Sequence, residues 1–173
     1  MAVGRLWVGP PWEAPAPGLL PVVIDPGRAF GTGAHATTRL CLAWLQELRR
    51  GSLLDVGCGS GVIAIAAAKL GHAPVTALDV DPAAVDATIR NAAANDVRVD
   101  ARLADAEHEP LPRADAAVAN IALAAVQAIA PRLRAPAVVT SGYLAGERPA
   151  LAGFRHTGRR VAAEWAADLW ERE

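Results

Sequence analysis

The sequence predicts a single α/β domain of 173 residues built on a mainly parallel sheet with helices on both faces. Short apolar runs that read as strands alternate with longer runs that read as helices. The expected strands are 53–56, 75–79, 97–103, 114–119 and 137–140, and the expected helices are 37–50, 62–70, 83–94 and 123–134. Such alternation is typical of parallel strands joined by crossover helices.

The first of these strands runs into a glycine-rich turn that opens a helix. Asp55 closes the apolar run, and Gly57, Gly59 and Gly61 follow at alternate positions. Residues without a Cβ let a ligand approach the backbone, and the first turn of a helix presents free N–H groups to it. The dinucleotide-binding fingerprint requires its third glycine where this chain has Val62. We therefore expect Asp55, Gly57, Gly59 and Gly61 to bind a different cofactor, although the turn could also be an ordinary packing turn.

The second strand ends in two acids with different expected roles. Asp79 lies about twenty residues beyond the glycines, where an acid can accept hydrogen bonds from a ribose diol. Asp81 precedes Pro82, and proline is favoured at the first helical position. We therefore expect Asp79 to bind the ligand and Asp81 to cap the helix.

A segment before the glycine turn reads as a flap over the ligand. It combines an aromatic residue, two glycines and small polar residues directly before the helix 37–50, and its predicted contacts are Phe30, Gly31, Thr32 and Gly33. His35, Thr37 or Thr38 could cap that helix. The alternative is a helix-entry loop without ligand contact.

Two polar residues follow the third and fourth strands. Asp105 could accept a hydrogen bond from an amino group of the ligand, or face solvent. Asn120 lies at the carboxyl end of the fourth strand, where open α/β sheets bind ligands. We expect it to meet the second substrate, with a helix N-cap as the alternative. Acids flank His108, but such close neighbours do not converge easily on one metal ion, so no metal is expected.

Composition excludes several classes of function. A formal net charge of −1 gives no sign of nucleic-acid binding. Two cysteines, Cys41 and Cys58, form no disulfide framework or metal cluster, which fits a reducing, cytoplasmic location. The sequence shows neither a membrane span nor a secretory signal.

The two ends of the chain add smaller elements. Short strands are expected at 5–8 and 22–24, and a short helix at 147–153. Residues 154–163 and 165–170 could form a terminal antiparallel hairpin, although the last segment could also be helical.

The pattern Asp-x-Gly-x-Gly-x-Gly at 55–61 resembles motif I of Rossmann-like, class I methyltransferases that use S-adenosylmethionine (AdoMet). The segment 25–38, Asp-Pro-Gly-Arg-Ala-Phe-Gly-Thr-Gly-Ala-His-Ala-Thr-Thr, is similar to a signature of the PrmA family, bacterial methyltransferases of ribosomal protein L-eleven. Segments 6–12, 78–82, 119–122, 141–142 and 164–165 also match that family. The resemblance implies a seven-stranded sheet of order 3-2-1-4-5-7-6, AdoMet as cofactor and S-adenosylhomocysteine as product.

The resemblance also implies a methyl acceptor. It suggests an amino group of a protein, either lysine or an α-amino group, with a ribosomal protein as the possible partner. The family usually carries an N-terminal recognition domain, and we expect residues 1–173 to be the methyltransferase domain alone, with 1–36 as lead-in and flap. Ala36 and Ala122 replace a common proline and leucine. A small-molecule methyltransferase or a non-catalytic AdoMet-binding module are the alternatives.

Two residues are the expected catalytic groups. An amine must be neutral to accept a methyl group, whereas lysine has a reference pKa of about 10.4. His35 is the candidate base by its chemistry, and packing at the helix entry is its alternative role. Asn120 could orient the amine and also touch the cofactor. We expect positioning to contribute more than general-base catalysis.

Overall fold

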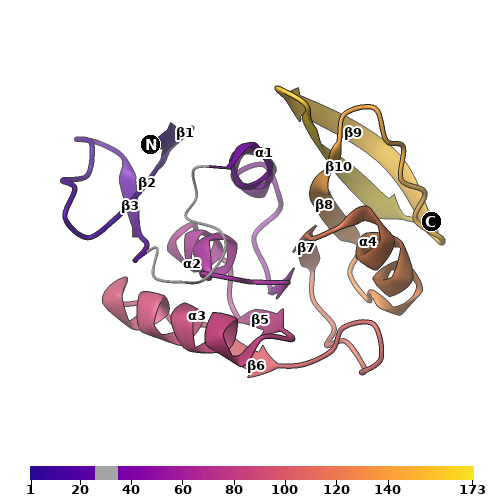
Figure 1. Ribbon diagram of the computed structural model, residues 1–173, viewed down its shortest axis with the longest axis horizontal. Helices are drawn as coiled ribbons and strands as arrows, with labels where there is room; N and C mark the ends of the chain where they lie inside the picture. Colours follow the sequence, from indigo (N-terminus) through magenta and orange to yellow (C-terminus); the bar gives the residue numbers. More distant parts are fainter. Residues whose placement is uncertain (26–34) are drawn as a thin grey trace.

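The computed structural model describes residues 1–25 and 35–173 and contains a seven-stranded sheet (Figure 1). Its strands are β4 (Leu53–Val56), β5 (Val75–Asp79), β6 (Asp100–Leu103), β7 (Ala116–Asn120), β8 (Ala137–Leu144), β9 (Phe154–Ala162) and β10 (Trp165–Arg172). They lie in the order β6-β5-β4-β7-β8-β10-β9, which reads 3-2-1-4-5-7-6 when counted along the chain. The five neighbouring strands β6, β5, β4, β7 and β8 are parallel to one another. Strand β10 is antiparallel to both of its neighbours, β8 and β9. The predictions of a mainly parallel sheet and a terminal hairpin are confirmed.

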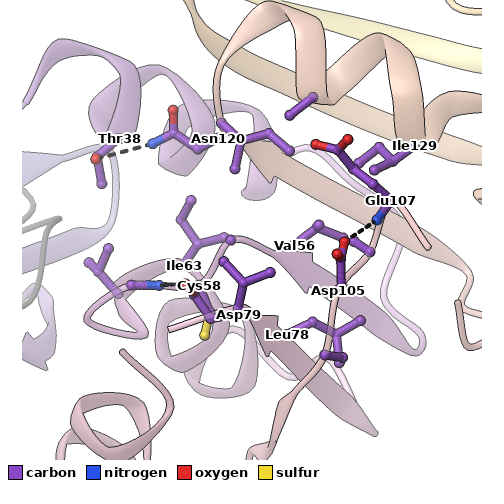
Figure 2. Close-up of a pocket in the computed structure, with 18 residues that line it drawn as sticks. Thr38, Val56, Cys58, Ile63, Leu78, Asp79, Asp105, Glu107, Asn120 and Ile129 are labelled. Atoms are coloured by element: carbon purple, nitrogen blue, oxygen red, sulfur yellow. Dashed lines mark hydrogen bonds between the residues drawn. The ribbon is translucent and has the colours of Figure 1, made fainter. Parts of the chain in front are cut away.

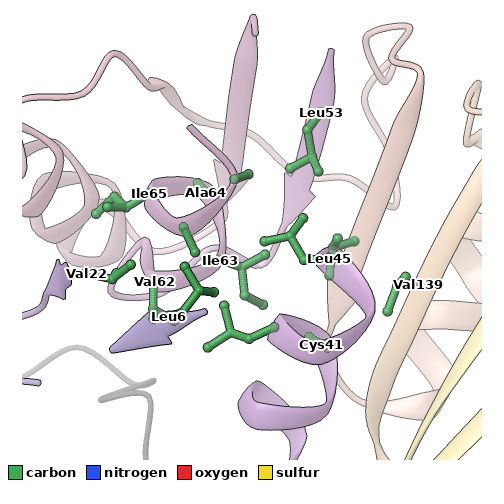
Figure 3. Packing of buried hydrophobic residues seen from close by; sticks show 14 of the residues in the cluster. Leu6, Val22, Cys41, Leu45, Leu53, Val62, Ile63, Ala64, Ile65 and Val139 are labelled. Carbon is green, nitrogen blue, oxygen red and sulfur yellow. The ribbon is translucent and has the colours of Figure 1, made fainter. Parts of the chain in front are cut away.

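Helices cover both faces of this sheet. They are α1 (Ala36–Leu45), α2 (Val62–Lys69), α3 (Pro82–Ala94) and α4 (Leu123–Ile129), which continues into the 3₁₀ turn η1 (Ala130–Arg132). Leu53 and Val139 pack with Leu45 of α1 and Ile63 of α2 on one face (Figure 3). Leu54 packs with Val126 of α4 on the other face. Successive strand residues point to opposite faces, so each half of the core takes alternate side chains.

A small second sheet precedes the large one. It consists of β1 (Ala2–Val3), β2 (Leu6–Gly9) and β3 (Leu20–Val23), and β3 runs parallel to β2. Asn95 holds β3 against the end of α3, because its side chain accepts from the Val23 amide at 2.9 Å and donates to the Val23 carbonyl. The neighbouring Asn91 accepts from the amide of Asp25 at 3.1 Å. These contacts hold β3 and Asp25 against α3.

Two predicted boundaries were wrong because local contacts end the elements differently. The first helix ends at Leu45 and not at Arg50, because Gln46 turns its side chain to the carbonyl of Val3 and the amide of Arg5. The third strand begins at Asp100, since Asp96 has a positive φ of 54° after the end of α3.

The predicted short helix at 147–153 is also wrong. In a helix the carbonyl of Glu147 would accept from the amide of Leu151. Here it accepts from Arg159 at 2.8 Å, and the same guanidinium binds the carbonyl of Ala145 at 2.9 Å. Pro149, which lacks an N–H group, lies in the same segment.

The predicted helix at 123–134 is shorter, because α4 gives way to η1 at Ala130, directly before Pro131. Cys41 and Cys58 are both buried and free. No helix in the described ranges has the length and apolar character needed to cross a membrane.

Candidate functional site

A cavity of about 310 Å³ opens at the carboxyl ends of β4, β5 and β7 (Figure 2). Parallel strands direct their ligands to this edge of an open sheet. The described lining residues are Thr38, Val56, Gly57, Cys58, Gly59, Val62, Ile63, Leu78, Asp79, Val80, Ala104, Asp105, Ala106, Glu107, Asn120, Ile121, Ala125 and Ile129. The cavity therefore joins segments that lie far apart in the sequence.

The glycine turn forms the floor of this cavity. The amides of Gly57 and Cys58 both donate to the Leu78 carbonyl, at 2.8 and 3.0 Å, which binds the turn to the end of β5. Gly57 has a φ of 74°, and a Cβ there would lie 2.3 Å from Cγ2 of Ile121. Only glycine satisfies both the backbone conformation and this close approach.

Asp79 links the floor to the adjacent wall. Its Oδ2 accepts from the Gly59 amide at 2.9 Å, and its Oδ1 accepts from the Asp81 amide at 3.0 Å. Asp81 in turn caps α3 by accepting from Ala83 at 2.9 Å, so its predicted capping role is confirmed. A carboxylate has further lone pairs with which to accept hydrogen bonds from a ligand hydroxyl.

Two predicted contact residues lie outside the cavity lining. Asp55 is completely buried; its Oδ2 accepts from the Ala64 amide of α2 at 3.0 Å, and its Oδ1 has no hydrogen-bond partner. Burial raises the pKa of Asp55 to about 7, the Ala64 amide lowers it, and nearby Asp79 raises it further. Gly61 begins α2 with a φ of 82°, and a Cβ there would lie 2.9 Å from the Thr88 side chain. Both residues support the turn from beneath.

Asn120 lies across the cavity from the glycine turn. Its Nδ2 points to Oγ1 of Thr38 at 3.5 Å, the outer limit of a hydrogen bond (Figure 2). The N-cap of α4 is Ala122, which makes no side-chain capping bond. The alternative prediction, that Asn120 caps α4, is therefore wrong.

Close backbone packing holds the segment that follows Asn120. The Ile121 amide donates to the Ser141 carbonyl at 3.1 Å. A Cβ on Gly142 would lie only 2.2 Å from the Ile121 carbonyl oxygen, and Gly142 has a φ of 102°. Gly57, in the turn after β4, and Gly142, in β8, thus both approach Ile121, and they fix where β7 ends.

His35 caps α1, one of the roles that the sequence left open. Its Nδ1 accepts from the Thr37 amide at 3.4 Å, and its ring lies edge-on to Trp165 with centroids 4.8 Å apart. His35 is not among the described residues that line the cavity. Four predicted contacts, Phe30, Gly31, Thr32 and Gly33, lie outside the described residues.

Asp105 forms the opposite rim of the cavity. One carboxylate oxygen accepts from the Glu107 amide at 2.9 Å, and the other contacts Nδ1 of His108 at 2.8 Å. The hydrogen bond from His108 lowers the pKa of Asp105, which stays charged. No group of three or more His, Cys, Asp or Glu residues that could hold a metal occurs in residues 1–25 and 35–173.

Sequence reasoning missed most of the apolar lining. Val80 follows the predicted ribose acid, lines the cavity and is 66% exposed. Its position after Asp79 was the available signal, because a residue next to a ligand acid at a strand end faces the same crevice. Thr38 was considered only as a helix cap. Its approach to Asn120 joins segments distant in the sequence and became visible only in the fold.

The family described as ribosomal protein L11 methyltransferase (PrmA) matches residues 1–167 of this chain. The chain belongs to this family. It is 46% identical over 170 residues to the ribosomal protein L11 methyltransferase of Symbiobacterium thermophilum, and the match covers 96% of this chain and 54% of that relative. It is 48% identical over 153 residues to the one from Bordetella bronchiseptica, covering 81% of this chain and 49% of the relative. The chain thus spans about half the length of the curated relatives that it matches.

A solved structure agrees over nearly the whole fold. The ribosomal protein L11 methylase of Lactobacillus delbrueckii subsp. bulgaricus superimposes with a TM-score of 0.89 at 29% identity, and the match covers 98% of this chain and 96% of that one. The predicted resemblance to PrmA enzymes, and to their Rossmann-like class I methyltransferase fold, is confirmed.

Proposed function

We propose that this chain is an AdoMet-dependent protein N-methyltransferase domain, with an amino group of a ribosomal protein as the acceptor. One observation carries the proposal: a glycine turn, a carboxylate and an amide from three different strands converge on one cavity. Membership of the PrmA family supports it. AdoMet supplies an activated methyl group, and the protein supplies orientation and electrostatics.

The residues present fit that cofactor. Gly57 and Gly59 line the cavity, and both have positive φ angles that favour glycine. Asp79 would accept hydrogen bonds from the ribose hydroxyls, and Asp105 would accept from the adenine amino group. Val80 and Ile129 offer apolar surface for the adenine ring. We also propose Phe30, Gly31, Thr32 and Gly33 as a covering flap, with Asp55 and Gly61 shaping the turn.

Asn120 is the proposed catalytic residue, and its task is to orient the acceptor. With Nδ2 directed at Thr38, the side-chain carbonyl is the atom left to accept a hydrogen bond from an amine. The amine must be neutral, and transfer out of water into the largely apolar cavity lowers the pKa of a lysine. With AdoMet bound, Asn120 would orient the amine toward the transferable methyl group, and we propose that this positioning contributes more than general-base catalysis.

The first experiment asks which molecules accept the methyl group. Labelled AdoMet is incubated with the protein and a bacterial lysate, and label is followed separately into protein and into small molecules. We expect label in protein, concentrated in a ribosomal protein band. Label confined to small molecules would establish the small-molecule alternative, and no transfer with intact AdoMet binding would establish the non-catalytic module.

The second experiment separates cofactor binding from catalysis. Asp79→Ala removes a charged acceptor worth roughly 1.5–3 kcal/mol, so AdoMet affinity should fall about tenfold or more in calorimetry. Asn120→Ala should leave AdoMet affinity nearly intact and reduce methyl transfer strongly. Lost stability with normal turnover in Asn120→Ala would contradict its proposed role.

A third variant tests whether His35 accepts a proton. His35→Asn keeps a side chain that can cap α1, because asparagine is a favoured N-cap residue. If His35 acts as a base, turnover falls although α1 keeps its cap. Unchanged turnover would leave His35 with its capping role alone.

A further inference from the structure

A second cavity, of about 480 Å³, lies at the opposite edge of the sheet from the first. Its described lining residues are Arg113, Pro131, Leu133, Arg134, Ala135, Pro136 and Arg172. Arg113 precedes β7 and Arg134 precedes β8, so both lie at the amino ends of parallel strands. Arg172 closes β10, which runs the other way and therefore ends at the same edge.

The lining of this cavity is strongly positive. Three arginines are among its lining residues, and none of the described lining residues carries a carboxylate. The whole chain has a formal net charge of −1, so this local excess does not reflect a basic protein. An adjoining cavity of about 330 Å³ shares Arg134 and adds Arg132, His108 and one acid, Glu109. Glu109 accepts from the Asp105 amide at 2.8 Å.

The acids near these arginines are not paired with them. Among the described residues, Asp115 accepts from Ser52 at 2.7 Å, and Glu171 pairs with Arg155 at 2.9 Å. Within that part of the chain, Arg113 and Arg134 make no ion pair or side-chain hydrogen bond. Their charges are therefore available to an external anion.

Arg172, and Arg132 of the adjoining cavity, lie against the protein at this edge of the sheet. The guanidinium of Arg172 donates to the Leu133 carbonyl and lies 4.5 Å from the centre of the Phe154 ring, so its orientation is fixed before any ligand arrives. The Nε of Arg132 is buried and has no hydrogen-bond partner among the described residues.

We propose that the cavity formed by Arg113, Arg134 and Arg172 binds a phosphate group. The planar fork of an arginine matches two phosphate oxygens, and such charge-assisted pairs are stronger than neutral hydrogen bonds. Because the cavity lies at the edge of the sheet remote from Asp79 and Asn120, the proposal stands independently of the methyl-transfer site. The phosphate can belong to a small polyphosphate or to an RNA backbone.

Paired double variants test this site. Arg113→Gln with Arg134→Gln removes two charges from the cavity. Arg90→Gln with Arg98→Gln removes two charges from exposed arginines that line none of the three cavities described above. Binding of inorganic pyrophosphate and of a short single-stranded RNA is measured by calorimetry at low ionic strength in phosphate-free buffer. We expect the cavity variant to bind about tenfold more weakly or worse, and the control variant to bind like the parent.

Each outcome decides the proposal. Binding of pyrophosphate alone identifies a small phosphate ligand, and binding of RNA alone identifies a phosphodiester backbone; both support the site if the cavity variant loses them. No binding by the parent, or an equal loss in the control variant, overturns the proposal. Equal AdoMet affinity in all three proteins verifies folding, and Arg134→Gln alone replaces the double variant if that one does not fold.

Discussion

Two carboxylates, Asp55 under the glycine turn and Asp168 in the terminal hairpin, are equally buried but very differently paired. Both are completely inaccessible. Asp168 accepts from the Tyr143 hydroxyl at 2.7 Å, from Nε2 of His156 at 2.7 Å and from the Arg159 guanidinium at 3.1 Å. Asp55 accepts a single hydrogen bond, from Ala64, and leaves one oxygen without a partner.

The difference separates a structural region from a functional one. In the hairpin, both carboxylate oxygens of Asp168 accept hydrogen bonds. Arg159 also donates to the carbonyls of Ala145 and Glu147. Under the glycine turn, the charge of Asp55 is poorly compensated, and burial raises its pKa to about 7. Buried groups with perturbed pKa values occur preferentially at functional sites, because such sites keep polar groups that the fold alone does not need. The predictions below test this contrast.

The largest expected effect is that of Asp168→Ala. Removing the carboxylate leaves Arg159 and the Tyr143 hydroxyl without their buried partner. Breaking a buried ion pair from one side costs about 3–5 kcal/mol, so urea unfolding should show a loss of that size. AdoMet affinity per folded molecule should not change, because the hairpin network lies outside the described cavity lining. An unstable variant with weakened affinity would instead couple the two regions.

Asp55→Asn should change how stability depends on pH. The pKa of Asp55 is raised from an ordinary value near 4 to about 7 in the fold, so the folded state holds a proton that the unfolded chain has lost. The parent therefore loses stability as pH rises from about 4 to about 7, and the loss is complete above pH 7. The variant lacks this loss, and relative to it the parent should weaken by roughly 2–4 kcal/mol over that range. A stability difference that is constant with pH would contradict the raised pKa.

Asp81→Ala tests a carboxylate that serves only a helix. Asp81 caps α3 by accepting from Ala83, and loss of such a cap costs about 1 kcal/mol. Thermal unfolding should show that modest loss, with AdoMet affinity close to that of the parent. An affinity loss as large as that of Asp79→Ala would give Asp81 a place in the ligand site.

Glu171→Gln should have the smallest effect. Its ion pair with Arg155 joins side chains that are 53% and 68% exposed. Exposed pairs contribute about 0–1 kcal/mol, and salt weakens them further. Chemical unfolding at low and high salt measures this effect. A loss of unfolding free energy as large as that of Asp168→Ala would show that burial does not decide how much a carboxylate contributes to stability.

The sequence predicted the parts of the fold that local patterns determine. The order strand, glycine turn, helix and acid was enough to place Gly57, Gly59 and Asp79 at one cavity, because parallel strands bring their carboxyl ends together. Asn120 followed from the same rule. Its proposed partner Thr38 did not, since the two residues meet only through the packing of α1 on the sheet.

Contacts between distant segments explain the errors. The sequence of residues 147–153 does not indicate that the Glu147 carbonyl accepts a hydrogen bond from Arg159. Likewise, the sequence around Leu45 does not indicate that Gln46 donates to the Val3 carbonyl of β1. Asp55 was expected in the ligand contact set because of its place in the motif. Alternation along β4 instead points it under α2, a consequence of strand geometry that a motif does not express.

The close approach of Gly142 to Ile121 has a consequence for the order of folding. The cofactor floor needs only β4, β5 and the helix between them, which are neighbours in sequence. The position of Asn120 needs β7 to pair with β8 on one side and with β4 on the other, where Ile121 meets Gly57. Contacts between distant segments form more slowly because a longer loop must close first. A folding chain would therefore form the glycine turn beside Asp79 before it brought Asn120 to the other side of the cavity.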